Sequence, residues 1–122
     1  MRKMLIVEDD ALVAMVLSRF LTRLGYTVCG PVVSGEEALE MVDREQPDGA
    51  LMDVHLAGKL NGIQTVQALH AHRALPVLFV SGYPRTTLLQ MGMSSGAVCL
   101  LKPVMRAELE LALSDLFAQH VG

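Results

Sequence analysis

The sequence predicts an α/β fold, in which a doubly wound parallel sheet of five strands carries helices on both faces and residues 1–122 form a single domain. Five short apolar runs alternate along the chain with five stretches whose apolar residues have helical spacing. Each crossover between parallel strands must be right-handed and must lie against the sheet, so this alternation requires helices on both faces. Hydrophobic residues make up 52% of the chain and aromatic residues only 4%, which is typical of an aliphatic sheet buried on both faces.

The first strand is expected at Lys3 to Val7, where an apolar run ends in the consecutive acids Glu8, Asp9 and Asp10. A helix is predicted from about Asp10 to Gly25, and aspartate is a residue type that caps helix N-termini. The apolar residues assigned to one face of this helix are Val13, Val16, Leu17, Phe20 and Leu24.

The second strand is expected at Tyr26 to Gly30, ended by Pro31. Ser34 then has the character of a helix N-cap, because Glu37 follows it by three residues. The second helix is predicted to extend to Pro47, and its apolar stripe is Ala38, Leu39 and Val42.

The remaining three units repeat this order. Strands are expected at residues 49–53, 76–80 and 97–101, and helices at about 62–72, 85–91 and 104–118. Asn61 is the expected cap of the helix that begins at residue 62. In the last helix Leu109, Leu111 and Leu113 cover more than one stripe, which predicts that some apolar surface stays exposed.

Charge and composition exclude several classes of function. Ten basic and thirteen acidic residues give a formal net charge of −3, which argues against a nucleic-acid surface. No apolar run is long enough for a membrane span or a signal peptide, so we expect a cytoplasmic protein without a membrane partner. Cys29 and Cys99 lack metal-ligand spacing and are expected to be buried apolar residues.

Polar residues follow or end four of the predicted strands. Because the carboxyl ends of parallel strands lie at one edge of the sheet, Glu8 to Asp10, Asp53, Ser81 and Lys102 are expected to be neighbours. Carboxylates gathered there repel one another unless a cation lies among them, and Mg²⁺ prefers carboxylate and carbonyl oxygens. Such a set can stabilise a phosphoryl group in transfer, with Asp53 as the candidate nucleophile.

Four segments at these strand ends carry a resemblance to a known family: Leu5 to Asp10, Leu51 to Asp53, Val80 to Gly82 and Leu101 to Pro103. Together, in this order and spacing, they resemble the receiver domains of two-component response regulators. The resemblance implies the flavodoxin-like strand order 2-1-3-4-5. It also implies a phosphoacceptor domain that is not an enzyme but assists its own phosphorylation and dephosphorylation.

By position, the resemblance implies that Asp53 accepts a phosphoryl group from the phosphohistidine of a sensor histidine kinase or of a phosphotransfer protein. Ser81 is implied as the switch hydroxyl and Lys102 as the cation that pairs with the phosphoryl group. The Mg²⁺ ligands that the resemblance implies are Glu8, Asp9, Asp53 and the backbone carbonyl of His55.

Two positions depart from the family pattern. Ala57 stands where the family often has proline, and the glycines fall at Gly58 and Gly62, which is consistent with one extra residue in the loop after Asp53. Cys99 stands where the family usually has an aromatic residue that swings inward on activation. Ser81-Gly82-Tyr83 resembles the Thr-Gly-Tyr motif of a subfamily of mostly stand-alone receivers. We therefore predict that Tyr83 supplies part of the aromatic switch.

The resemblance also implies a downstream protein target, and the predicted apolar surface favours a partner or a second copy bound through the fourth helix, fifth strand and fifth helix. Two alternatives remain open. A receiver-like module that is never phosphorylated would be expected to have lost the acidic pair, the acceptor or the lysine. A Mg²⁺-dependent phosphatase with an aspartyl-phosphate intermediate usually has a second acid two residues after the nucleophile, where this chain has His55.

Overall fold

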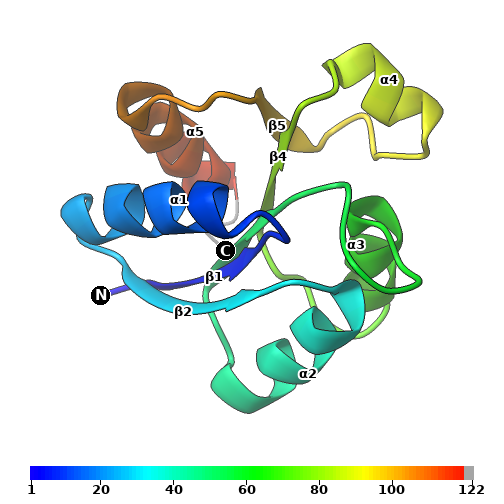
Figure 1. Ribbon diagram of the computed structural model, residues 1–122, viewed down its shortest axis with the longest axis horizontal. Helices are drawn as coiled ribbons and strands as arrows, with labels where there is room; N and C mark the ends of the chain where they lie inside the picture. Colours follow the sequence, from blue (N-terminus) through cyan, green and yellow to red (C-terminus); the bar gives the residue numbers. More distant parts are fainter. Residues whose placement is uncertain (120–122) are drawn as a thin grey trace.

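The computed structural model describes residues 1–119, in which five parallel strands and five helices alternate (Figure 1). The strands are β1 (Lys3–Val7), β2 (Thr27–Val32), β3 (Gly49–Met52), β4 (Val77–Ser81) and β5 (Val98–Leu101). The helices are α1 (Ala11–Arg23), α2 (Gly35–Glu45), α3 (Gly62–His70), α4 (Arg85–Gln90) and α5 (Arg106–Gln119). The strand order is β2-β1-β3-β4-β5, so the predicted doubly wound α/β fold is confirmed.

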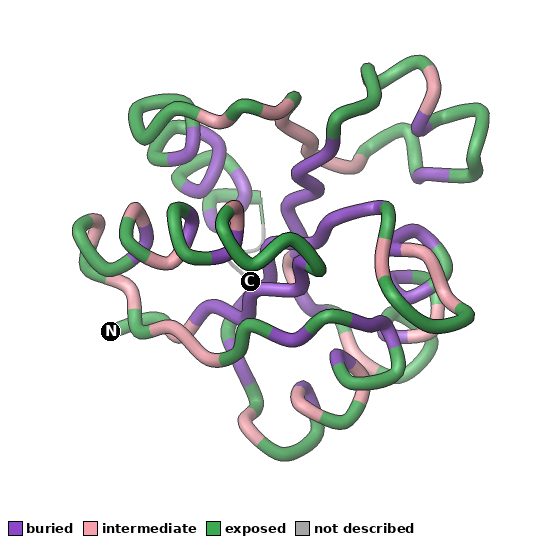
Figure 2. The backbone as a smooth tube through the Cα atoms, in the orientation of Figure 1, coloured by how far each residue is buried: buried purple, intermediate pink, exposed green. Residues whose placement is uncertain are grey.

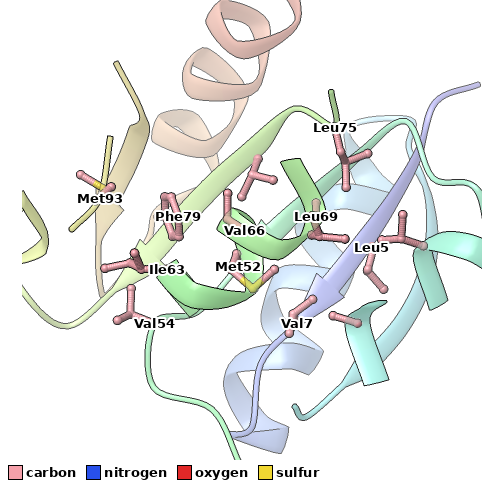
Figure 3. Packing of buried hydrophobic residues seen from close by; sticks show 14 of the residues in the cluster. Leu5, Val7, Met52, Val54, Ile63, Val66, Leu69, Leu75, Phe79 and Met93 are labelled. Carbon is pink, nitrogen blue, oxygen red and sulfur yellow. The ribbon is translucent and has the colours of Figure 1, made fainter. Parts of the chain in front are cut away.

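Helices cover both faces of the sheet and enclose two hydrophobic cores (Figure 1). Helices α1 and α5 pack on one face against Met4, Ile6 and Leu78. Helices α2, α3 and α4 pack on the other face, over a cluster that includes Leu5 and Met52 (Figure 3). The central strands are therefore buried on both sides, as Figure 2 shows, which explains why their sequences are continuous apolar runs rather than alternating ones.

The sequence prediction is wrong in detail for the end of β2 and for the buried face of α1. Strand β2 continues through Pro31 to Val32 instead of ending at the proline. A proline without a backbone N–H is tolerated there because β2 lies at the sheet edge and its register with β1 shifts between Leu5 and Val7. In α1 the fully buried stripe is Ala14, Leu17 and Leu21, while the side chain of Val16 is 38% exposed.

The predicted helix caps are confirmed. Asp10 Oδ1 accepts hydrogen bonds from the backbone N–H groups of Leu12 and Val13 at 2.9 and 3.2 Å. Ser34 caps α2 by accepting from the Glu37 N–H at 3.1 Å. Asn61 forms a reciprocal capping box with Gln64 at the start of α3, with bonds of 2.8 and 2.9 Å. These bonds fix where each helix begins, next to the edge that carries the polar residues.

As the sequence of the last helix predicts, part of its apolar surface is exposed. Leu111 is 69% exposed, although Leu109 and Leu113 of the same helix are fully buried. Within residues 1–119 no helix is both long and apolar enough to cross a lipid bilayer.

Candidate functional site

The carboxyl ends of four neighbouring strands deliver the polar residues to one edge of the sheet. Glu8 follows β1, Asp53 follows β3, Ser81 ends β4 and Lys102 follows β5. Backbone hydrogen bonds between strands continue into these residues: the Asp53 N–H donates to Val7 O at 2.9 Å and the Lys102 N–H donates to Ser81 O at 2.8 Å. The backbone of each candidate residue is therefore held by the sheet rather than by a free loop.

Three carboxylates converge at this edge. Glu8, Asp9 and Asp53 each have an oxygen within 4.8 Å of the oxygens of the other two. Glu8 and Asp53 are 2% and 6% exposed, whereas Asp9 is exposed to solvent. The site thus has two acids in its floor and one at its rim.

Lys102 lies between the two buried acids. Its Nζ is 2.7 Å from Glu8 Oε1 and 3.3 Å from Asp53 Oδ2. Partial burial by itself lowers the pKa of Lys102, but the two carboxylates outweigh it and raise the pKa above its ordinary value. The lysine is therefore a fixed cation of the site at neutral pH.

The environment of Glu8 disfavours its charged form. Burial raises the pKa of Glu8 above its ordinary value, and the neighbouring Asp53 carboxylate adds to the effect. The contact with Lys102 and the Asp10 N–H, which donates to Glu8 Oε2 at 3.1 Å, offset this only in part. The Glu8 Oε1 contact with Lys102 is an ion pair rather than a well-aligned hydrogen bond.

The charge balance of the cluster fits a divalent cation. Three carboxylates face a single ammonium group, so negative charge remains after Lys102 has been counted. The available donors are carboxylate oxygens, which a hard cation such as Mg²⁺ prefers. The residues present therefore fit Mg²⁺ in both charge and ligand type.

The Asp53 carboxylate is held at both oxygens. Oδ1 accepts a hydrogen bond from the backbone N–H of Val54 at 2.8 Å, and Oδ2 faces Lys102. Gly62 at the start of α3 lies so close that a Cβ added to it would overlap the Asp53 carbonyl oxygen. The end of β3 and the start of α3 are thus in direct contact, which limits how far the Asp53 backbone can move.

A chain of contacts runs along the mouth of the site. Ser81 is buried, and its Oγ accepts a hydrogen bond from the Tyr83 N–H at 3.0 Å. The Tyr83 hydroxyl lies 2.5 Å from His55 Nε2, and the two ring centroids are 5.1 Å apart. Sequence reasoning missed this role of the His55 side chain; the only signal was that both residues follow the ends of adjacent strands.

Cys99 does not behave as the buried apolar residue that its sequence context predicts. Both Cys99 and Cys29 are partly exposed. The Arg85 guanidinium lies 3.5 Å from Cys99 Sγ and donates hydrogen bonds to the carbonyl oxygens of Ser95 and Ala97 at 2.5 and 2.7 Å. The Arg85 side chain at the start of α4 therefore links this helix to Cys99 of β5 and to the segment that precedes the strand.

Comparisons with known proteins agree with this geometry. The model of the response regulator receiver domain family matches residues 4–114. The transcriptional regulatory protein PdtaR of Mycobacterium tuberculosis is 31% identical over 118 residues, which cover 93% of this chain and 57% of PdtaR. The probable C4-dicarboxylate response regulator DctR of Bacillus subtilis is 33% identical over 91% of this chain and 50% of its own length.

Solved structures show the same fold. The signal receiver domain of a modulated diguanylate cyclase from Desulfovibrio desulfuricans G20 superposes with a TM-score of 0.88 at 32% identity, covering 98% of this chain and 95% of that one. The REC domain of the PhyR response regulator of Erythrobacter litoralis gives a TM-score of 0.85 at 26% identity, covering 96% and 90% of the two chains. The chain spans about half the length of the curated relatives it matches.

Replacing Glu8 by Gln is expected to raise the free energy of unfolding at neutral pH in metal-free buffer, because burial and the neighbouring Asp53 carboxylate disfavour the charged form of Glu8 in the folded protein. The pKa of Glu8 is raised in the folded protein, so the parent loses stability as the pH rises from the ordinary value of 4.5 through the folded-state pKa, and the variant does not. Urea unfolding curves of the two proteins should converge at acid pH and separate as the pH rises.

The matched control is Glu40→Gln, because Glu40 is exposed on α2 and its neutralisation should give no such divergence. A Glu8→Gln variant that is less stable than the parent at neutral pH would show the opposite of this expectation, namely that ionised Glu8 stabilises the fold through Lys102.

Proposed function

The chain belongs to the response regulator receiver domain family, and from this premise we propose that it is the phosphoacceptor of a two-component system, phosphorylated on Asp53. The observation that carries the assignment is the position of Lys102, whose ammonium group contacts Glu8 and Asp53 at 2.7 and 3.3 Å. A cation held beside the candidate nucleophile lies where negative charge collects during phosphoryl transfer. The proposed donor is the phosphohistidine of a sensor histidine kinase or of a phosphotransfer protein.

In the proposed reaction a carboxylate oxygen of Asp53 attacks the phosphorus of the donor. An O–P bond forms, the P–N bond to the imidazole breaks, and its electron pair returns to the ring nitrogen. Val54 and Lys102 each hold one of the Asp53 oxygens, so the carboxylate is oriented before the donor arrives. Phosphoryl transfer relies mainly on such positioning and on charge neutralisation.

The proposed metal is Mg²⁺, and the residues that would hold it are Glu8, Asp9, Asp53 and the backbone carbonyl of His55. When bound, Mg²⁺ supplies positive charge that lets an anionic donor approach an anionic nucleophile. The exposed Asp9 carboxylate can turn toward an ion without losing a buried contact, whereas Glu8 is fixed by Lys102 and the Asp10 N–H.

We assign the signalling switch to Ser81 and Tyr83. In the unmodified protein the Ser81 hydroxyl accepts from the Tyr83 N–H. A hydroxyl that turns toward a phosphoryl group on Asp53 would no longer accept from this amide. The Tyr83 backbone would then be free to shift, and its ring, whose hydroxyl is hydrogen-bonded to His55, would move with it. Tyr83 would in this way take part of the role that an aromatic residue at the position of Cys99 has in other receivers, by a shift in population between two arrangements.

The proposed output is protein contact. We treat residues 1–122 as one receiver unit that acts in the cytoplasm as a phosphoacceptor rather than as a turnover enzyme. A downstream protein or a second copy is proposed to bind the surface formed by α4, β5 and α5. The exposed large apolar residues of these three elements are Leu89, Leu101 and Leu111, and Met91 at the C-cap of α4 is exposed as well.

The two alternatives are less well supported. A receiver-like module that is never phosphorylated would have no need for three convergent carboxylates, two of which contact a lysine. An aspartyl-phosphate phosphatase would need a second acid two residues after Asp53, and this position holds His55, whose ring is engaged with Tyr83.

Incubation with Mg²⁺ and a small acyl phosphate is expected to add one phosphoryl group to the parent protein and none to Asp53→Asn, as measured by intact mass. Lys102→Met should be labelled at least about tenfold more slowly, because it removes the cation that faces the developing charge. Asp43→Asn, which changes an exposed acid on α2, is the matched control and should be labelled like the parent. A parent protein that gains no mass would favour the non-phosphorylated module.

The Tyr83 ring is expected to change environment when a phosphoryl mimic such as beryllofluoride binds with Mg²⁺. The chain has two tyrosines, and Tyr26 stacks on Phe117 with a centroid distance of 6.1 Å, which makes it an internal reference. In an NMR spectrum of ring-labelled protein the Tyr83 signals should shift and those of Tyr26 should stay in place. Unmoved Tyr83 signals in a protein that binds the mimic would contradict its role in the switch.

A further inference from the structure

The loop between β3 and α3, residues 53–61, carries both the candidate phosphoacceptor and the candidate carbonyl ligand. Its two ends are joined, because the Gly62 N–H donates to Val54 O at 2.8 Å. Its middle is exposed: His55 and residues 57–59 all face solvent. The shape of this exposed part must therefore be set by contacts with another segment of the chain.

That segment is the connection from β2 to α2. The Ala57 N–H donates to Val33 O at 3.0 Å, and Ser34 and Ala57 form an isolated parallel bridge. These contacts hold the loop only at Ala57. The residues between Ala57 and the α3 cap at Asn61 must be held by another partner.

Glu36 is this partner. Its Oε2 accepts a hydrogen bond from the Lys59 N–H at 3.2 Å. Gly58 has a left-handed φ of +82°, and a Cβ added there would lie 2.6 Å from the same oxygen, so the carboxylate fills the space beside the glycine. The Lys59 N–H is the main reason that the pKa of Glu36 lies below its ordinary value, which keeps the carboxylate charged.

The base of this side chain is fixed. Glu36 lies in the first turn of α2, separated from the Ser34 cap only by Gly35. A Cβ added to the adjacent Gly35 would overlap Thr65 Oγ1 of α3, so the two helices are in close contact at this point. The backbone of Glu36 is therefore held by the helix cap and by close packing of α2 on α3, while its side chain contacts the loop.

We propose that Glu36 is a positioning residue of the Mg²⁺ site, which holds the loop after Asp53 in the shape that presents the backbone carbonyl of His55 to the ion. This inference rests on the proposed function, because it requires His55 to be a metal ligand. In this role Glu36 is not itself a metal ligand; it acts on the backbone of the loop at Lys59 and beside Gly58.

The test compares three variants at this position with the parent and with Glu40→Ala, an exposed acid one turn further along α2. Glu36→Ala removes the acceptor, Glu36→Gln keeps an oxygen at the same reach, and Glu36→Asp keeps the charge in the first turn but is one methylene too short. Mg²⁺ affinity is measured by titration followed through backbone amide NMR shifts, and exchange of the Lys59 amide hydrogen is measured in metal-free buffer.

We expect Glu36→Ala and Glu36→Asp to weaken Mg²⁺ binding about threefold to tenfold and to speed exchange of the Lys59 amide. Glu36→Gln should stay close to the parent, and Glu40→Ala should match it. If Asp preserves the affinity and Gln loses it, Glu36 acts through its charge alone and the positioning role is wrong. Unchanged Mg²⁺ affinity in Glu36→Ala overturns the proposal as well.

These outcomes are separable from the proposed function. The phosphorylation rate at saturating Mg²⁺ should be the same in Glu36→Ala and the parent, with only the Mg²⁺ concentration for half-maximal rate increased. A parent that binds Mg²⁺ but is not phosphorylated would contradict the proposed function, and the affinities of the variants would still decide the role of Glu36. A parent that does not bind Mg²⁺ would overturn this inference directly.

Discussion

The contact of one partly buried lysine, Lys102, with the two buried carboxylates of Glu8 and Asp53 is the interaction on which the site depends. Lys102 lowers the cost of placing Glu8 and Asp53 side by side, but a third carboxylate, Asp9, leaves the cluster negative. Burial opposes ionisation of Glu8, and the attraction to the carboxylates that raises the pKa of Lys102 offsets this opposition only in part. The charge of this cluster fits a divalent cation, and under the proposed function that cation would allow a phosphoryl group to approach.

Much of the fold could be predicted because the central strands are continuous apolar runs that are easy to recognise in the sequence. β3 and β4 are buried along their whole length and are read as continuous apolar runs, and the caps at Asp10, Ser34 and Asn61 have short-range sequence signals. The errors fall where tertiary context decides. Pro31 is accepted because β2 is an edge strand with a register shift, and neither property can be derived from local sequence.

The site was predictable for a related reason. Parallel strands bring their carboxyl ends to one edge, so the positions of Glu8, Asp53, Ser81 and Lys102 along the chain were enough to place them together. The contacts of His55 with Tyr83 and of Glu36 with Lys59 were not predictable, because they depend on the direction of side chains in or beside irregular loops. Periodicity carries no information about these directions.

The most direct test of the central claim is chemical identification of the modified residue. The protein is phosphorylated with an acyl phosphate and Mg²⁺ and then reduced with borohydride, which converts an aspartyl phosphate to homoserine, and the converted position is located by peptide mass spectrometry. The account predicts homoserine at Asp53 and at no other acid. Conversion at Asp9 or Glu8, or a phosphoryl gain without any conversion, would contradict it.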